Sequence, residues 1–141
     1  MAYLLDTNVV SELRKRGRAN ANVKRWQSGQ PSWDQWISVI SLMEVRIGVV
    51  RALKSDPPFA RILDEWYRSQ LVPAYSGRTL PVDLITAEKR ADFEKRRTLS
   101  YSDALIAATA ATKGLVVATR NISDFEGLGL ELVNPWECEN E

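Results

Sequence analysis

The chain has 141 residues, with no histidine and a single cysteine. Without histidine there is no imidazole base and no imidazole metal ligand, and one cysteine makes neither an internal disulfide nor a thiolate zinc cluster. The 19 basic and 18 acidic side chains leave a net charge of +1, and 45% of the residues are hydrophobic, as in an ordinary globular protein. Any metal should therefore be a hard cation held by oxygen ligands, such as Mg²⁺, Mn²⁺ or Ca²⁺.

The length fits one domain, which we expect to span residues 1–141. No apolar run approaches the roughly 20 residues that a membrane helix needs. The segment Met1–Asp6 lacks the basic and long apolar regions of a signal peptide. We therefore expect a cytoplasmic protein that makes no contact with a membrane.

The chain alternates between short apolar runs, typical of buried strands, and longer segments with helical periodicity. The predicted strands are residues 3–5, 36–40, 79–80, 115–118 and 130–133. The predicted helices are residues 9–16, 21–27, 41–53, 57–72, 83–97 and 102–113. Apolar strands separated by helices favour an α/β fold, in which helices cover both faces of a parallel sheet.

The charges are unevenly distributed along the chain. All 19 basic residues lie within residues 1–120, whereas residues 121–141 contain acids and no base. Basic clusters occur at residues 14–18 and 95–97. Such clusters suit a phosphate backbone, but the same residue types also solvate exposed helix faces, so the pattern leaves both roles open.

Polar side chains stand where a parallel sheet binds its ligands, beyond the carboxyl ends of the strands. They are Asp6, Thr119, Asn121 and Asp124, which follow predicted strands, and Glu44 and Asp103, which begin predicted helices. Carboxylates gathered together cannot all stay ionised unless they bind cations. Two divalent ions on such a cluster form a site that hydrolyses phosphodiesters, and this chemistry needs no histidine.

Each of these acids also has a local structural interpretation. Residues 41–44 have the pattern of a capping box, and Asp103 lies where a helix dipole favours an acid. Residues 6–8 fit an Asx turn, and residues 121–124 fit a loop. A shared metal site is the more economical interpretation of all four acids, but the spacing alone leaves both open.

Four segments, in this order, resemble the motifs of PIN-domain proteins. They are residues 4–12 (LLDTNVVSE), 41–48 (SLMEVRIG), 102–110 (SDALIAATA) and 117–125, where VATRN is followed by Asp124 and Phe125. Residues 77–81 and the Asn134–Trp136 ending resemble the VapC and FitB-like branch of this family. The resemblance covers essentially the whole chain.

This resemblance implies a fold, an activity and partners. The fold would be a three-layer α/β/α sandwich on a small, mostly parallel sheet. The activity would be that of a Mg²⁺-dependent (or Mn²⁺-dependent) endoribonuclease, the toxin of a toxin–antitoxin pair, which cleaves tRNA or rRNA. A VapB-like antitoxin would neutralise the protein and bind operator DNA with it, and the usual assembly would be a homodimer.

The resemblance also assigns roles to single residues. Asp6, Glu44 and Asp103 match metal ligands of the family, and Asn8 and Thr119 match accessory polar positions. Many members carry an acid where this chain has Asn121. Asp124, three residues later, is positioned to supply the carboxylate of a second metal, so Asn121 and Asp124 complete the predicted catalytic set.

The expected mechanism is hydrolysis by a metal-activated water. Mg²⁺ held by Asp6 and Asp103 would position and deprotonate the water, with Glu44 assisting. The water would then attack the phosphodiester in line. The basic residues Arg14, Lys15, Arg16 and Arg96 would hold the RNA backbone away from the metal.

Two other functions remain open at this point. The acids could form a regulatory Mg²⁺ site in an interaction module, as in phosphoacceptor domains, but such domains need a lysine after a late strand and Thr119–Arg120 does not clearly supply it. Alternatively, the chain could be a catalytically silent module that binds nucleic acid.

Overall fold

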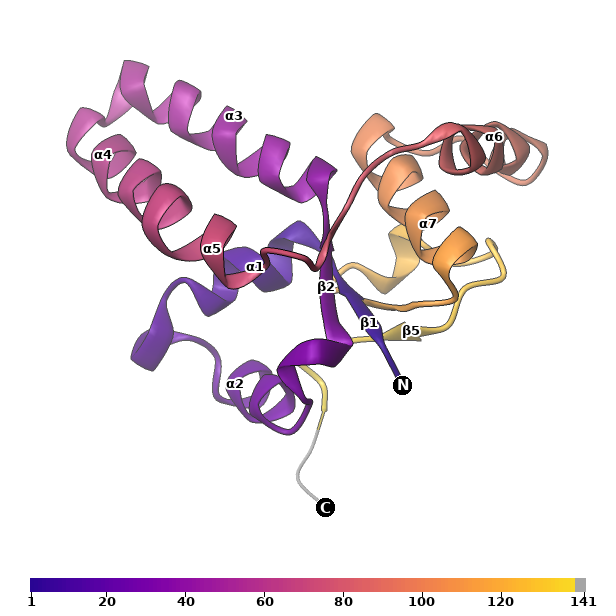
Figure 1. Ribbon diagram of the computed structural model, residues 1–141, viewed down its shortest axis with the longest axis horizontal. Helices are drawn as coiled ribbons and strands as arrows, with labels where there is room; N and C mark the ends of the chain where they lie inside the picture. Colours follow the sequence, from indigo (N-terminus) through magenta and orange to yellow (C-terminus); the bar gives the residue numbers. More distant parts are fainter. Residues whose placement is uncertain (139–141) are drawn as a thin grey trace.

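The computed structural model describes residues 1–138 and contains a single five-stranded sheet, in which every pair of neighbours is parallel (Figure 1). The strands are β1 (Tyr3–Leu5), β2 (Gln35–Ser38), β3 (Thr79–Leu80), β4 (Val116–Ala118) and β5 (Leu132–Val133). Their order is β3-β2-β1-β4-β5, so the direction of winding reverses at β1. Sheets of this kind bind ligands in the crevice beside such a reversal.

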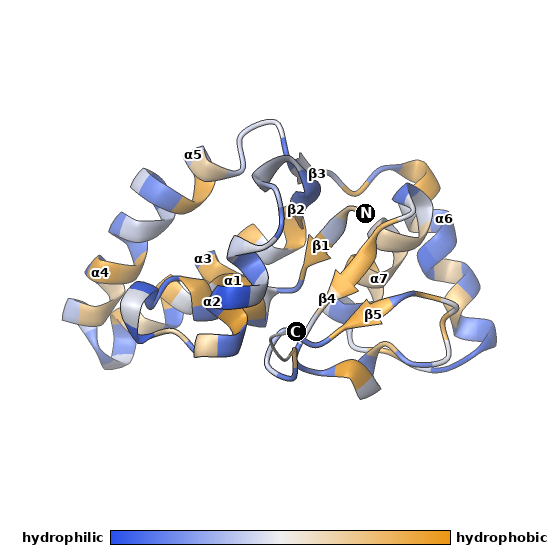
Figure 2. Ribbon diagram, turned by 90° about the horizontal axis from the view of Figure 1, so that it is seen from below, coloured by the Kyte–Doolittle hydropathy of each residue, from blue (hydrophilic) through white to orange (hydrophobic). Residues whose placement is uncertain are grey.

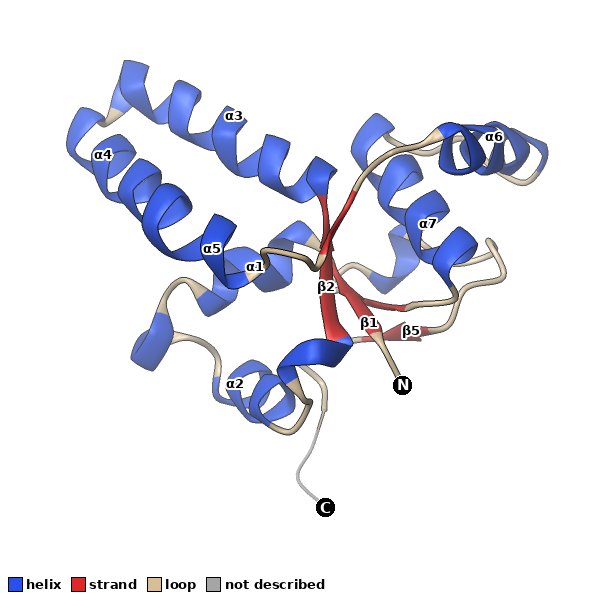
Figure 3. Ribbon diagram, in the orientation of Figure 1, coloured by secondary structure: helices blue, strands red, loops and turns tan. Residues whose placement is uncertain are grey.

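Helices cover both faces of the sheet, which confirms the predicted three-layer α/β/α sandwich (Figures 1 and 3). The helices are α1 (Thr7–Leu13), α2 (Ala21–Ser28), α3 (Val39–Ser55), α4 (Pro57–Trp66), α5 (Val72–Ala74), α6 (Leu84–Asp92) and α7 (Tyr101–Lys113). Helices α1 to α5 connect β1, β2 and β3 on one face, and α6 and α7 connect β3 to β4 on the other. No helix within residues 1–138 has the length and apolar character needed to cross a membrane.

The alternation of side chains along the strands divides the interior into two cores. Successive residues of a strand point to opposite faces of the sheet. Leu4 of β1 and Val117 of β4 pack with α7, whereas Leu5 and Ala118 pack with α1, α2 and α3. All four side chains are fully buried. Figure 2 shows β1, β4 and β5 as hydrophobic strands between more polar helices.

Helix α3 begins earlier than the sequence predicts. The expected strand over residues 36–40 ends at Ser38, and α3 starts at Val39. The apolar, β-branched pair Val39–Ile40 is typical of a strand. However, the Ser38 hydroxyl accepts a hydrogen bond from the N–H of Ile40 at 3.0 Å and caps the helix there. Glu44 therefore lies in the second turn of α3, and the capping-box interpretation of this residue is wrong.

Two long predicted helices are shorter in the structure. The segment over residues 57–72 consists of α4, a π-helical turn (Tyr67–Leu71) and α5. The segment over residues 83–97 consists of α6 followed by a 3₁₀ turn (Phe93–Lys95). Helix α7 begins one residue before its predicted start and ends at Gly114, as predicted.

Gly114 ends α7 in the left-handed conformation, with φ at 67° and ψ at 35°. A Cβ in this conformation costs about 1–2 kcal/mol, so we expect Gly114→Ala to lower the free energy of unfolding by that amount in urea denaturation. Gly17→Ala is the matched control, because Gly17 has open space around it and no positive φ. Equal effects of the two substitutions would contradict this account of the helix end.

Candidate functional site

Asp6 is a buried carboxylate at the carboxyl end of β1, with 5% of its surface exposed. Its backbone N–H donates to the Ala118 carbonyl at 2.9 Å, which fixes it beside β4. One carboxylate oxygen accepts the N–H of Thr7 at 2.8 Å and caps α1. The other accepts the Thr119 hydroxyl at 2.8 Å and the Asn8 amide at 3.2 Å. Asp6 thus combines the predicted local cap with a place in a polar network.

Thr119 joins the two sides of this network. Its side chain is fully buried, and its hydroxyl oxygen accepts the Asn121 N–H at 3.0 Å and the Asn8 amide at 3.3 Å. The Asn8 carbonyl oxygen accepts the N–H of Arg120 at 3.2 Å. The structure therefore brings together Asn8 and Thr119, the two predicted accessory residues, and places both against Asp6.

Thr7 links Asp6 to Glu44. Its hydroxyl donates to a Glu44 carboxylate oxygen at 2.6 Å and lies 2.9 Å from the hydroxyl of Ser41, which is buried. Neither Thr7 nor Ser41 is among the site residues that the sequence predicts. A signal was present for Ser41, because residues three positions apart share a helix face and Ser41 stands three before Glu44.

Asp103 approaches the same carboxylate from α7. Ser100 caps this helix by accepting the N–H of Asp103 at 3.3 Å, and the Asp103 side chain is half-buried. Burial is the main reason why the pKa of Asp6 is raised to about 6. Hydrogen bonds from Thr119 and Thr7 lower this pKa, whereas the charges of Asp103 and Glu44 raise it. Two further carboxylates therefore act on the buried Asp6 carboxylate at this end of the sheet.

The chemistry of these groups fits a hard divalent cation. Carboxylate and hydroxyl oxygens are the ligands that Mg²⁺ and Mn²⁺ prefer, and a cation would favour the ionised form of a buried acid among other acids. Within residues 1–138, however, no three acidic or cysteine side chains are close enough together to hold one ion. The structure thus shows neighbouring carboxylates, two of them joined through Thr7, rather than an assembled set of ligands.

Asn121 and Asp124 lie at the margin of this network. The backbone N–H of Asn121 donates to the Thr119 hydroxyl, and Asn121 itself is exposed. Asp124 lies in a 3₁₀ turn (Ile122–Asp124), and its N–H donates to the Asn121 carbonyl at 3.0 Å. The hydrogen bonds of the described residues do not connect the Asp124 carboxylate to Asp6, so its role as a metal ligand stays a prediction.

The four basic residues predicted to hold RNA each have a contact within the chain. The contacts are Arg14 with the Phe59 ring at 5.4 Å, Lys15 with Glu12 at 3.0 Å, Arg16 with Gln70, and Arg96 with the Gly127 carbonyl at 3.3 Å. None of these contacts includes one of the site carboxylates. The basic residue that does adjoin the network is Arg120, which is not among the residues predicted to hold RNA.

Three adjoining hollows with shared lining residues lie along α1, beside α2 and the α4–α5 segment, and together we call them the α1–α4 groove. Leu13, Trp66 and Tyr75 supply apolar parts of its lining, and Arg14 and Arg16 lie along it. The other charged residues that line it are Lys24, Arg25, Arg61 and Glu65. An apolar lining with mostly positive edges suits an amphipathic, negatively charged segment.

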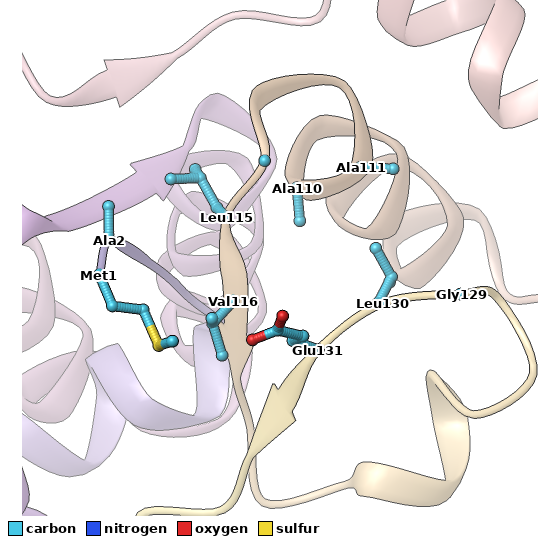
Figure 4. Close-up of a pocket in the computed structure, with 10 residues that line it drawn as sticks. Met1, Ala2, Ala110, Ala111, Leu115, Val116, Gly129, Leu130 and Glu131 are labelled. Carbon is cyan, nitrogen blue, oxygen red and sulfur yellow. The ribbon is translucent and has the colours of Figure 1, made fainter.

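A separate cavity of about 310 Å³ opens at the other end of the strands (Figure 4). Met1 and Ala2 precede β1 there, and Leu115 stands at the start of the β4 segment. Its lining is mainly small or apolar, with one carboxylate, Glu131. None of the predicted site residues lines this cavity, so the candidate site stays at the carboxyl ends of the strands.

Comparison with known proteins gives consistent matches over most of the chain. The PIN-domain family model matches residues 3–127. The chain is 37% identical to VapC ribonuclease Y4jK of Sinorhizobium fredii, over 95% of this chain and 97% of that protein. It is 33% identical to Toxin FitB of Neisseria gonorrhoeae, over 94% of this chain and 97% of that protein. The structure of FitAB bound to an IR36 DNA fragment matches with a TM-score of 0.84 and 31% identity, over 98% of both chains.

The raised pKa of Asp6 predicts how stability depends on pH. The folded protein binds the Asp6 proton more tightly than the unfolded chain, whose aspartate pKa is 3.8. The stabilisation from protonation is complete below pH 3.8 and is lost as the pH rises through about 6. In a chelator, acidification from pH 8 to pH 5 should therefore raise the free energy of unfolding by about 1 kcal/mol.

Asp6→Asn should flatten this dependence, because it removes the titrating group. Asp92→Asn changes an exposed acid of α6 and should leave the dependence intact. Urea denaturation at each pH measures both. A flat wild-type profile, or one that falls on acidification over this range, would contradict the assignment. The absence of histidine from the sequence keeps this pH range clear of imidazole titration.

Proposed function

Because the chain belongs to the PIN-domain family and, within it, to the group of VapC and FitB toxins, we propose that it is a divalent-metal-dependent endoribonuclease. The residues that we propose as ligands of the metal are Asp6, Glu44 and Asp103. The observation that carries the proposal is the buried Asp6 carboxylate, on which two further carboxylates act. Mg²⁺ is the expected ion, with Mn²⁺ as a substitute. The expected substrates are tRNA or rRNA.

Some residues of the site would orient the carboxylates, and Glu44 would assist proton transfer. A bound divalent ion supplies a water of lowered pKa and a counter-charge for the phosphodiester. Hydrogen bonds from Thr119 and Asn8 fix the orientation of Asp6. The Thr7 hydroxyl donates to one oxygen of Glu44 and so fixes the orientation of this carboxylate, which would assist deprotonation of the attacking water. Asn121 and Asp124 would supply further oxygen donors if a second ion binds.

We also propose that a VapB-like antitoxin places a negatively charged, amphipathic segment in the α1–α4 groove. Trp66 and Leu13 offer it apolar contacts, and Arg14 and Arg16 offer it positive charge. These arginines are also predicted to hold the RNA backbone. Occupation of the groove would therefore compete with RNA for the same charges, which gives a physical basis for neutralisation.

The proposed complex would bind operator DNA, as FitAB binds a DNA fragment in its solved structure. The antitoxin would supply the contacts with the bases. A toxin that cleaves cellular RNA acts where that RNA is found, so we propose the cytoplasm as its location.

An exposed apolar stripe along α3 supports a homodimer. Val39, Met43, Ile47, Val50 and Leu53 are between 37% and 54% exposed, and their spacing places them on one helix face. Exposed apolar patches of this kind mark interaction surfaces, and a two-fold axis lets one patch cover its own copy. We therefore propose that two copies pair through α3.

Substitution in this stripe tests the dimer. Ile47→Glu would place a charge at the centre of the interface and should convert the protein to a monomer, as measured by sedimentation equilibrium. Ile62→Glu introduces the same charge at an exposed residue of α4 outside the stripe and should leave the dimer intact. A dimer that survives Ile47→Glu would rule out α3 as the interface.

Loss of the site carboxylates tests the nuclease. We expect Asp6→Asn and Asp103→Asn each to lower the rate of Mg²⁺-dependent cleavage of total RNA by about 10²- to 10³-fold, because each removes a negative charge that would hold the metal. Asp92→Asn, at an exposed position on α6, should leave the rate unchanged. A chelator should abolish cleavage by the wild type.

Undiminished cleavage by either site variant would refute the proposal. Thermal stabilisation by Mg²⁺ without any RNA turnover would instead favour a catalytically silent, metal-regulated module. In cells, induction of the wild type should arrest growth and induction of Asp6→Asn should not. Co-expression of the antitoxin should relieve the arrest, and this outcome separates a toxin from a nuclease of another role.

A further inference from the structure

The Asn134–Trp136 turn, which follows β5, has no part in the carboxylate network. It lies at the same end of the sheet, because the N–H of Thr119 donates to the Val133 carbonyl at 2.9 Å. The Asn134 side chain closes the turn by accepting the N–H of Trp136 at 3.0 Å. The Asn22 amide of α2 donates to the Trp136 carbonyl at 2.8 Å and anchors the turn from the other side.

The Asn134–Trp136 turn holds Arg120 in place. The Arg120 guanidinium lies over the Trp136 ring, 5.3 Å from its centroid. The Asn134 amide donates to the Arg120 carbonyl at 3.5 Å, and the Arg120 N–H donates to Asn8 at 3.2 Å. The backbone of this arginine is therefore held from both sides, by the turn and by the network, and its side chain is held by a cation–π contact with an indole.

The charges around Arg120 leave its donors available to a ligand. None of the ion pairs within residues 1–138 includes this arginine. Glu12 acts on it electrostatically, but the two Glu12 oxygens already accept the Lys15 ammonium and the Asn20 N–H, both at 3.0 Å. The cation–π contact with Trp136 does not use the N–H groups of the guanidinium as donors to an oxygen, so these groups can bind the oxygens of a phosphate.

Arg120 also stands next to the residues that would do the chemistry. It directly follows Thr119, which donates to Asp6. An RNA strand that reaches the carboxylates must bring its own negative charges to this end of the sheet, and a fixed cation at the same end lowers the cost of that approach. The other basic residues discussed above do not adjoin the network.

We propose that Arg120, held in place by the Asn134–Trp136 turn, binds a phosphate of the RNA strand beside the scissile bond. This inference rests on the proposed nuclease function and deepens it. Arg120 positions the strand and takes no part in proton transfer. Trp136 acts through Arg120, because its ring holds the guanidinium and its packing lies in the core shared with α1 and α2.

Steady-state cleavage of a labelled single-stranded RNA by Arg120→Gln is the primary test. Loss of one charge-assisted hydrogen bond should raise KM about tenfold, with kcat within about twofold of the wild type, because the contact is the same in ground and transition states. The slope of log KM against log salt should fall by about 0.7, the amount expected for one phosphate contact on a single strand.

Three further variants separate binding from a structural role. Arg120→Lys keeps the charge and should recover the salt slope, but only part of the KM, because an ammonium lacks the forked N–H donors that match a phosphate. Trp136→Leu should give an intermediate KM with the full salt slope, since the cation remains. Arg51→Gln removes an exposed arginine of α3 and should change neither KM nor slope.

An unchanged KM and salt slope in Arg120→Gln would overturn the proposal, as would a fall in kcat at constant KM.

Fluorescence anisotropy with the same RNA provides a second readout, in the Asp103→Asn background with Mg²⁺. There, Arg120→Gln should weaken binding about tenfold. If the wild type fails to cleave, the nuclease function fails, but the anisotropy still decides the role of Arg120. If the wild type cleaves and both readouts are unchanged, only the role of Arg120 fails.

Discussion

The burial of the Asp6 carboxylate is the constraint on which this site depends. A carboxylate with 5% of its surface exposed needs hydrogen-bond donors for both oxygens. The chain supplies them from two places, the start of α1 and the segment after β4. These segments meet only because β1 and β4 are parallel neighbours with their carboxyl ends together. The position of Thr119, and through it of Asn121 and Arg120, follows from this requirement.

Burial and hydrogen bonding act on Asp6 in opposite directions, and burial is the stronger. A surface aspartate would be ionised at neutral pH with no cost to folding, whereas Asp6 has a pKa of about 6 and pays for its charge in stability. Asp103 and Glu44 add to this cost. A bound cation would offset the repulsion that the fold tolerates without one.

The sequence contains enough to predict the sheet, the two layers of helices and the gathering of Asp6 and Thr119, since these follow from apolar strands and from where parallel strands end. The start of α3 is harder, because Val39 and Ile40 favour a strand and only the Ser38 cap reverses that preference. The role of Arg120 depends on a tertiary contact with Trp136, across β5, which no local pattern contains. Basic clusters along the chain likewise do not reveal which arginine adjoins the carboxylates.

The central claim is that Asp6 is a buried acid whose ionised form a divalent cation stabilises. Carbon-13 NMR titration of the Asp6 carboxyl, with and without Mg²⁺, tests it most directly. In a chelator the pKa should be about 6. With saturating Mg²⁺ it should fall well below this value, because the bound ion favours the carboxylate. An identical titration in the two conditions would contradict the account, since it would mean that Mg²⁺ does not bind at this carboxylate.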